Sequence, residues 1–274
     1  MRRLFVLLAV LGMLSIGACK PTEPAGPDVS SPAPVVQEPE GSGDAEPAAE
    51  AETMEPVAEP AESAAPEAEA SAAATWDFED AEAGAVPSGW SVAKTGEGPG
   101  GQWQVLEDES APAGPKVLGQ VSLEGPKPSY FLCLADETSY ADVDLSVQFK
   151  GVQGKIDQGG GPVWRFQDEN NYYVARMNPL ESNFRLYKVI DGERTKLASA
   201  DVDIPDEDLD ADDPLLNKWH TIRVVHRGDQ IQCSLNGGPP LEFQDASITS
   251  AGKIGLWVKA DAVTSFDNLT AAAP

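Results

Sequence analysis

Short apolar or alternating segments, separated by Gly, Pro, Asn and Asp, run through residues 76–274. This region contains no long 3.6-residue repeat, the pattern that marks an amphipathic helix. Two-residue signals such as Asp191-Gly192 and Asn236-Gly237 suit tight turns between strands. So many short strands in one region predict an all-β fold, a two-sheet sandwich or jelly roll. We expect strands at 75–79, 102–106, 117–122, 129–134, 143–150, 162–167, 171–177, 183–190, 220–226, 230–235, 241–243, 254–259 and 264–270.

Alternation within three consecutive strands predicts one shared polar face. Successive side chains of a strand point to opposite sides, and strands joined by short loops are usually neighbours. Apolar residues such as Trp164, Phe166 and Tyr173 are expected to face the core. Trp257 alternates with an apolar set on its own strand and could join the opposite face. That face is predicted to carry Arg165, Gln167, Tyr172, Arg176, Asn178, Asn183, Arg185 and Tyr187.

This predicted face has the chemistry of a sugar-binding surface. Aromatic rings can stack on the C–H face of a sugar, and fixed polar groups can hydrogen-bond its hydroxyls. Guanidinium groups also bind carboxylates in a bidentate way, which would suit uronic acids. A solvated sheet face with cross-strand Arg–acid pairs and packed Tyr side chains remains the alternative.

The chain is strongly acidic, with 45 Asp and Glu residues against 19 Lys and Arg and a net charge of −26. This charge argues against nucleic acid as a partner and against direct contact with anionic lipid. Residues 20–75 consist largely of Ala, Glu and Pro, with 13 acidic residues against Lys20 alone. Such a segment buries too little apolar surface to fold, so we expect residues 19–75 to form a disordered, extended linker.

The N-terminus combines Arg2 and Arg3 with an apolar run over residues 4–14 and the sequence LSIGAC, which ends at Cys19. It resembles a bacterial lipoprotein signal, which implies removal of residues 1–18 and lipidation of Cys19. An ordinary secretory signal cleaved near Ala18 is the alternative. The resemblance implies a protein tethered to the bacterial cell envelope, through its lipid alone. Lys20 in place of Asp favours the outer membrane.

Three stretches carry a second resemblance: GPVWRFQDENNYYVARMN (161–178), WHTIRV (219–224) with CSLNG (233–237), and GKIGLW (252–257) leading to FDNL (266–269). In this order they resemble the laminin-G-like, concanavalin A-like lectin/glucanase superfamily, and most closely the bacterial 3-keto-disaccharide hydrolase domain. The resemblance covers nearly all of 76–274 and implies two curved antiparallel sheets. Related jelly-roll modules often bind a structural calcium where the first and last strands meet, which here points to Glu79 and Asp267.

The main hypothesis is that the domain binds carbohydrate, as a monomer. The family resemblance also implies a glycoside hydrolase acting on 3-keto-disaccharides or related modified sugars, for which Asp168, Glu169 or Glu181 could supply an acid pair. A structural or adhesion module that binds protein is the third possibility, because one fold hosts many functions. The glucanase pattern Glu-x-Asp-x-Glu is not matched, since its nearest counterpart (201–207) lacks the first Glu and contains Pro205.

The remaining reactive side chains are expected to be structural. His220 and His226 share one strand face but lie about 20 Å apart, too far to share a metal. Cys133 and Cys233 fit apolar patterns and are predicted to be buried free thiols, although an oxidising compartment would allow them to pair. The acidic loop 201–213 resembles a calcium loop only in part, since Ala211 replaces the expected Gly.

Overall fold

The computed structural model describes residues 73–208 and 212–274. The predicted signal peptide, Cys19 and nearly all of the predicted linker lie outside the described residues. Among those that are described, no helix is long and apolar enough to cross a membrane. The structure therefore tests the sandwich prediction, and it leaves the predictions for the N-terminal segment as predictions.

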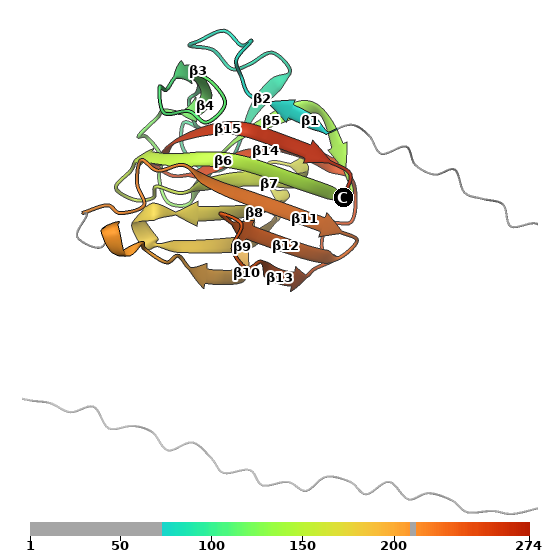
Figure 1. Cartoon of the computed structure of the whole chain (residues 1–274). Helices are drawn as coiled ribbons and strands as arrows, with labels where there is room; N and C mark the ends of the chain where they lie inside the picture. The colour runs from blue at the N-terminus through green and yellow to red at the C-terminus, as the bar shows by residue number, and fades with distance from the viewer. Residues whose placement is uncertain (1–72, 209–211) are drawn as a thin grey trace, which may run out of the picture. The chain divides into compact units, whose positions relative to one another are not determined.

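The fold is a sandwich of two antiparallel sheets, as predicted (Figure 1). Sheet A contains, in spatial order, β13 (Leu241–Gln244), β12 (Gln230–Leu235), β11 (His220–Arg227), β6 (Val143–Gln153), β15 (Val263–Ala272), β4 (Lys116–Gln120) and β3 (Trp103–Glu107), and β1 (Ala74–Trp76) also pairs with β15. Sheet B contains β10 (Glu193–Asp201), β9 (Asn183–Ile190), β8 (Asn171–Asn178), β7 (Gly160–Asp168), β14 (Gly252–Lys259), β5 (Ser129–Tyr140) and β2 (Trp90–Gly96). Two short 3₁₀ helices, η1 (Pro179–Glu181) and η2 (Asp206–Asp208), lie in connections.

Each strand predicted from the sequence has a counterpart, and two strands were missed. The missed strands are β2 and β10, which pair at opposite edges of sheet B. The sequence of β10, ERTKLASAD, is mostly polar, as suits a strand in which no residue is fully buried. Edge strands of this kind give a weak apolar signal, although the Asp191-Gly192 turn before β10 does imply a returning strand.

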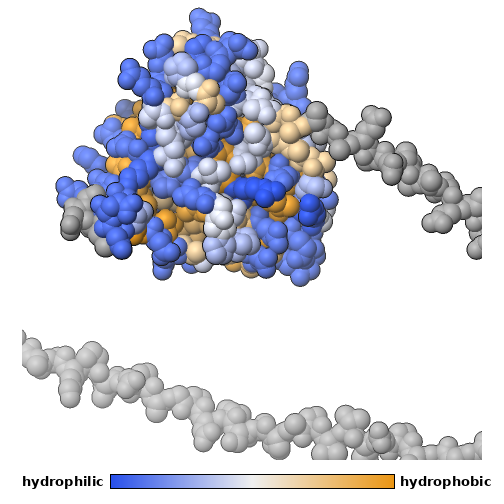
Figure 2. Space-filling view, in the orientation of Figure 1, coloured by the Kyte–Doolittle hydropathy of each residue, from blue (hydrophilic) through white to orange (hydrophobic). Residues whose placement is uncertain are grey.

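The two sheets differ in how they bury their faces. In sheet A the strands alternate, as in β11, where buried His220, Ile222 and Val224 are separated by less buried residues. The face of the molecule seen in Figure 2 is mostly hydrophilic, with smaller apolar areas between the polar residues. In sheet B the central strands are buried almost continuously, and seven of the eight residues of β8 are buried. Both faces of sheet B are therefore buried in its central strands, whereas one face of sheet A is exposed to solvent.

The main core lies between the sheets. It includes Trp164, Tyr173, Phe149, Phe266 and Leu256, each with no exposed surface. Cys133 and Cys233 also belong to this core, and both are free and buried, as predicted. Burial raises the pKa of both thiols, so neither is a reactive thiolate at neutral pH.

A buried polar network sits inside this core. Trp164 Nε1 donates to His226 Nδ1 over 2.9 Å, and Tyr173 OH donates to Asp245 Oδ1 over 2.5 Å. The rings of Trp164 and Tyr173 meet the His226 ring edge to face. His220 is buried as well, so both histidines have the core placement that their strand position predicted. Burial, followed by the nearby Arg165 guanidinium, lowers the pKa of His226 to about 4.

This network predicts an acid-sensitive fold. His226 is neutral in the folded state and titrates near its ordinary pKa of 6.5 when unfolded. Between about pH 6.5 and pH 4 the unfolded chain binds the extra proton, so stability falls as the pH falls. The total loss from this residue should be about 3 kcal/mol. The free energy of unfolding, measured by chemical denaturation at each pH in this range, should fall less steeply with falling pH for His226→Gln than for the wild type. Equal slopes would contradict the assignment.

Candidate functional site

The face of sheet B turned away from sheet A carries a second buried cluster. We call it the concave face. Its apolar part comprises Tyr130, Leu132, Leu134, Val163, Phe166, Tyr172, Val174, Tyr187, Val189 and Trp257. These residues come from β5, β7, β8, β9 and β14, and Tyr172 and Trp257 have no exposed surface.

Curvature of sheet B explains how this outer face becomes buried. The Arg194 Cζ lies 4.3 Å from the ring centroid of Tyr187 in β9 and 5.0 Å from that of Tyr130 in β5. Strands β9 and β5 are four positions apart in the sheet, which would separate them by about 19 Å if the sheet were flat. The sheet therefore curls, so that side chains from distant strands converge on its outer side.

Seven of the nine residues predicted for the ligand face lie together on this concave face. Tyr172, Tyr187 and Trp257 belong to its aromatic cluster. Arg176 lies directly opposite Arg185 across the β8–β9 pair. Asn178 and Asn183 are opposite each other at the end of the same pair. The alternation in β8, β9 and β14 therefore predicted the face of the sheet on which these side chains lie.

Arg165 and Gln167 lie elsewhere, which corrects the grouping. Arg165 has a positive φ of 46°, and the pairing of β7 with β8 shifts register after Trp164. This bulge reverses the alternation, so Phe166 joins the concave face instead. The Arg165 guanidinium is buried at a loop cluster, where it donates to the carbonyls of Ala141, Ile248 and Gly228. Gln167 is exposed and bonds to carbonyls of residues 250 and 251.

One end of the concave face holds a compact charged group. Glu181 Oε2 accepts from Arg176 Nη2 over 2.9 Å, from Asn183 Nδ2 over 3.2 Å and from Arg185 Nη1 over 3.3 Å. Burial alone would raise the pKa of Glu181, but these hydrogen bonds lower it to about 2. Glu181 is therefore an anion at neutral pH and holds the two arginines in place. A carboxyl with so low a pKa is a poor proton donor in general acid catalysis.

Several buried polar atoms on and beside this face have no hydrogen-bond partner within the described protein. They are Arg176 Nε and Nη1, Arg194 Nη1, Trp257 Nε1, Asn178 Nδ2, Asn183 Oδ1 and Gln158 Oε1. A buried polar group left unpaired costs about 1–3 kcal/mol, and folded proteins contain few of them. Their concentration around Arg176, whose side chain is only 1% exposed, marks this region as the candidate site.

Arg194 is the residue of the site that the sequence analysis missed. Its guanidinium is surrounded by three rings, since Trp257 lies 5.7 Å away in addition to Tyr130 and Tyr187. Cation–π contacts of this kind hold the side chain in one position. Arg194 was missed because β10 was missed, and the Asp191-Gly192 turn was the signal that could have revealed both.

The acids considered for catalysis are dispersed. Asp168 and Glu169 are exposed at the β7–β8 turn, where Asp168 accepts from Asn170 and Asn171. Glu181 alone of the three predicted acids touches the arginines of the concave face. Asp157, fully buried, pairs with Lys259 over 2.8 Å, and it is a further carboxylate near Arg176. The concave face thus offers fixed donors and aromatic surface more plainly than a pair of catalytic acids.

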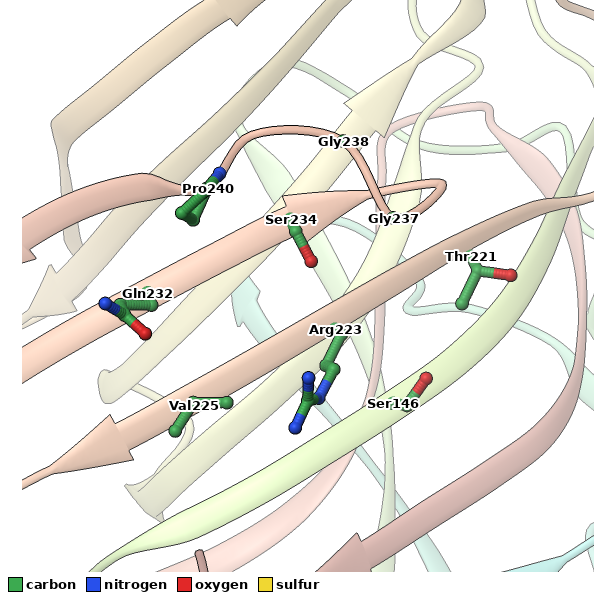
Figure 3. A pocket seen from close by; sticks show the side chains of 9 residues that line it. All are labelled: Ser146, Thr221, Arg223, Val225, Gln232, Ser234, Gly237, Gly238 and Pro240. Atoms are coloured by element: carbon green, nitrogen blue, oxygen red, sulfur yellow. The ribbon is translucent and has the colours of Figure 1, made fainter.

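A second hollow lies on the outer face of sheet A (Figure 3). Its lining is largely polar and includes Ser146, Thr221, Arg223, Gln232 and Ser234. Arg223 forms a bidentate pair with Asp144, and 57% of its side chain is exposed. Because none of these side chains has a buried unpaired polar atom, this groove is a weaker candidate than the concave face.

The predicted calcium position is occupied by protein hydrogen bonds. Asp267 accepts from the backbone N–H groups of Ala113 and Asn268, and Glu79 accepts from that of Lys116. The Lys116 ammonium donates to the carbonyls of Glu79 and Ala81. In the described part of the chain, no group of three or more His, Cys, Asp or Glu side chains could hold a metal. Structural calcium therefore stays a prediction.

Comparisons with known proteins agree with this architecture. A carbohydrate-binding module, CBM66 from Bacillus subtilis, is 19% identical, with a TM-score of 0.50 over 67% of this chain and 95% of that one. The structure of a cellulose-induced protein, Cip1, is 12% identical, with a TM-score of 0.50 over 73% of this chain and 97% of that one. These likenesses show the fold alone. No curated protein sequence matches this chain.

The family assignment comes from the sequence of the domain. Residues 78–271, which include every strand except β1 and the last residue of β15, match a family described as the 3-keto-alpha-glucoside-1,2-lyase-like domain. This is the family whose resemblance the three sequence stretches carried. The chain therefore belongs to the 3-keto-alpha-glucoside-1,2-lyase-like domain family.

Proposed function

We propose that this protein binds carbohydrate through the concave face of sheet B. The observation that carries the proposal is the group of buried, unpaired polar atoms around Arg176. Arg176 lies beside the ring of Tyr187, and Arg194 lies beside the rings of Tyr187 and Trp257. Sugars offer many hydroxyl groups to such donors and acceptors, and their C–H faces pack on aromatic rings. Ligand sites commonly combine an apolar wall with a few fixed polar groups in this way.

The fold neighbours support the same reading at a coarser level. CBM66 is a carbohydrate-binding module by its name, and its chain is covered almost completely by the matching region. The family description instead supports an enzyme that acts on 3-keto sugars. This glycoside-cleaving alternative stands beside simple binding, with Glu181 as an ionised carboxylate that contacts the concave-face arginines.

A protein-binding role has less support from the described surface. The large apolar side chains that are exposed there are Val92, Leu123 and Leu180. They come from β2, from the loop after β4 and from η1, and so do not belong to one strand or one loop. Protein-binding surfaces usually present a contiguous apolar patch.

The N-terminal segment completes the proposal. A lipid on Cys19 would tether the domain to the bacterial cell envelope, with the outer membrane favoured by Lys20. The acidic Ala/Glu/Pro-rich segment would then act as a spacer, because like charges and frequent prolines favour extended chain. The support for this part is the sequence of residues 1–75 alone.

The binding proposal predicts that Arg185→Ala weakens glycan binding about tenfold or more, the cost of one charged hydrogen bond. A panel of neutral and acidic glycans is first screened with residues 73–274, and affinities are then measured by calorimetry. Arg223→Ala, on the outer face of sheet A, is the matched control and should bind as the wild type does. The melting temperature of each variant checks folding. Failure of every glycan to bind would refute the proposal.

The hydrolase alternative is tested with the same protein. Incubation with 3-keto-disaccharides, followed by chromatography of the sugars, would show turnover if the domain is an enzyme. Turnover that persists in Arg223→Ala and is lost in Glu181→Gln would favour the enzyme. Binding without any turnover would favour a carbohydrate-binding module.

The anchor proposal predicts that Cys19→Ser releases the protein from membranes. The thiol is the site of acylation, and stable attachment by lipid requires the acyl chains themselves. Membrane and soluble fractions of the expressing bacterium should show the wild type with membranes and the variant without. Full retention of Cys19→Ser in the membrane fraction would contradict the anchor.

A further inference from the structure

The concave face is positively charged in a protein whose net charge is −26. Arg176 and Arg185 share the single carboxylate of Glu181. Lys259, which lies opposite Tyr130 in the sheet, is neutralised by Asp157. No acidic side chain among the described residues forms an ion pair with Arg194. Three guanidinium groups therefore face one shared carboxylate, which leaves an excess of positive charge.

The unpaired donors of Arg176 and Arg194 lie beside the same aromatic ring, that of Tyr187. The Cζ atoms of Arg176 and Arg194 lie 5.9 Å and 4.3 Å from the centroid of the Tyr187 ring. Arg176 has two buried nitrogen atoms without a partner, and Arg194 has one. A guanidinium is always charged and presents its N–H groups in a planar fork that matches a carboxylate. Neither side chain can lose its charge to relieve the unpaired donors.

The Tyr187 hydroxyl reports the same positive field. Burial would raise the pKa of this phenol, yet the pKa is lowered by the Arg176 guanidinium, the hydrogen bond from Arg185 and the charge of Arg194. By contrast, burial raises the pKa of Tyr130 and Tyr172 on the same face. The environment around Tyr187 therefore favours negative charge, in addition to the geometry of the donors.

We propose that the ligand of the concave face is an acidic sugar, whose carboxylate binds Arg176 and Arg194 while its ring packs on the neighbouring aromatic side chains. This inference rests on the proposed function, and it adds the class of sugar. Arg176 is fixed by Glu181, and Arg194 by the three rings around it, so both donors are held before the ligand arrives. Such preorganisation reduces the entropy lost on binding.

The test compares matched sugars that differ only in charge. Short oligomers of glucuronate, galacturonate and mannuronate are each paired with the form in which every carboxylate is reduced to a primary alcohol. Calorimetry with the full chain should show that one acidic series binds at least about tenfold more tightly than its reduced partner, the effect of one charged hydrogen bond. Arg194→Gln should abolish this preference, since it removes the cation and leaves a shorter, uncharged polar side chain.

Controls separate a local effect from a loss of folding. Arg194 lies on edge strand β10 and is only partly buried, so Arg194→Gln should stay folded, with only a small fall in melting temperature from the lost cation–π contacts. Arg176→Gln should also abolish the preference. The melting temperature of this variant should fall, because Glu181 loses its shortest hydrogen bond, the one from Arg176. Arg223→Gln, an exposed arginine on sheet A, should retain the preference in full.

The outcomes distinguish this inference from the function on which it rests. Equal affinity for the acidic and the reduced sugars, or a preference that survives in Arg194→Gln, would overturn the acidic-sugar assignment and leave carbohydrate binding intact. Binding of no sugar, charged or neutral, would overturn both. A preference that is lost in Arg194→Gln and kept in Arg223→Gln would establish the assignment.

Discussion

The curl of sheet B is the constraint on which the rest of the structure depends. A flat seven-stranded sheet packed against sheet A would leave its outer face in water, and Tyr172 and Trp257 would be exposed there. Because the sheet curls, side chains from β5, β9, β10 and β14 meet on its outer side and exclude water from one another. The second cluster therefore contributes to stability through burial, and it brings Arg194 beside three rings from separate strands.

The same curl explains why the polar atoms of the concave face reduce the stability of the fold. Curling buries Arg176 to 1% exposure, although two of its nitrogen atoms have no partner in the described protein. A charged side chain buried in this way is destabilising unless it is paired, and Glu181 pairs with only part of the guanidinium. A face that served stability alone would favour apolar residues at these positions. The retained cost is understandable if a ligand meets the remaining donors, which is why these atoms carry more weight than the open groove on sheet A.

Sequence alternation predicted much of this site because strand geometry is periodic. In β8, β9 and β14 the two-residue period separates Tyr173, Leu186 and Leu256 in the main core from Arg176, Tyr187 and Trp257 on the other face. The alternation is interrupted at Arg165, which has a positive φ and lies at a bulge that the local sequence pattern does not predict. It also gives no information on curvature. The convergence of Arg194 with Tyr130 depends on strands distant in sequence, and it could be seen only once the whole sheet was assembled.

Electrostatics then sets how an acidic ligand would reach this face. Charges separated by more than about 8 Å are largely screened at physiological ionic strength, so the acidic surface and linker impose only a weak long-range repulsion. Among these buried side chains, the low dielectric strengthens the attraction between a carboxylate and Arg176 or Arg194. The protein would therefore discriminate between ligands after contact and not during their approach. Association rates would be modest, and ligands would differ mainly in their dissociation rates. If the acidic spacer holds the domain at a membrane, as proposed, selection among acidic ligands would still depend on contact with Arg176 and Arg194.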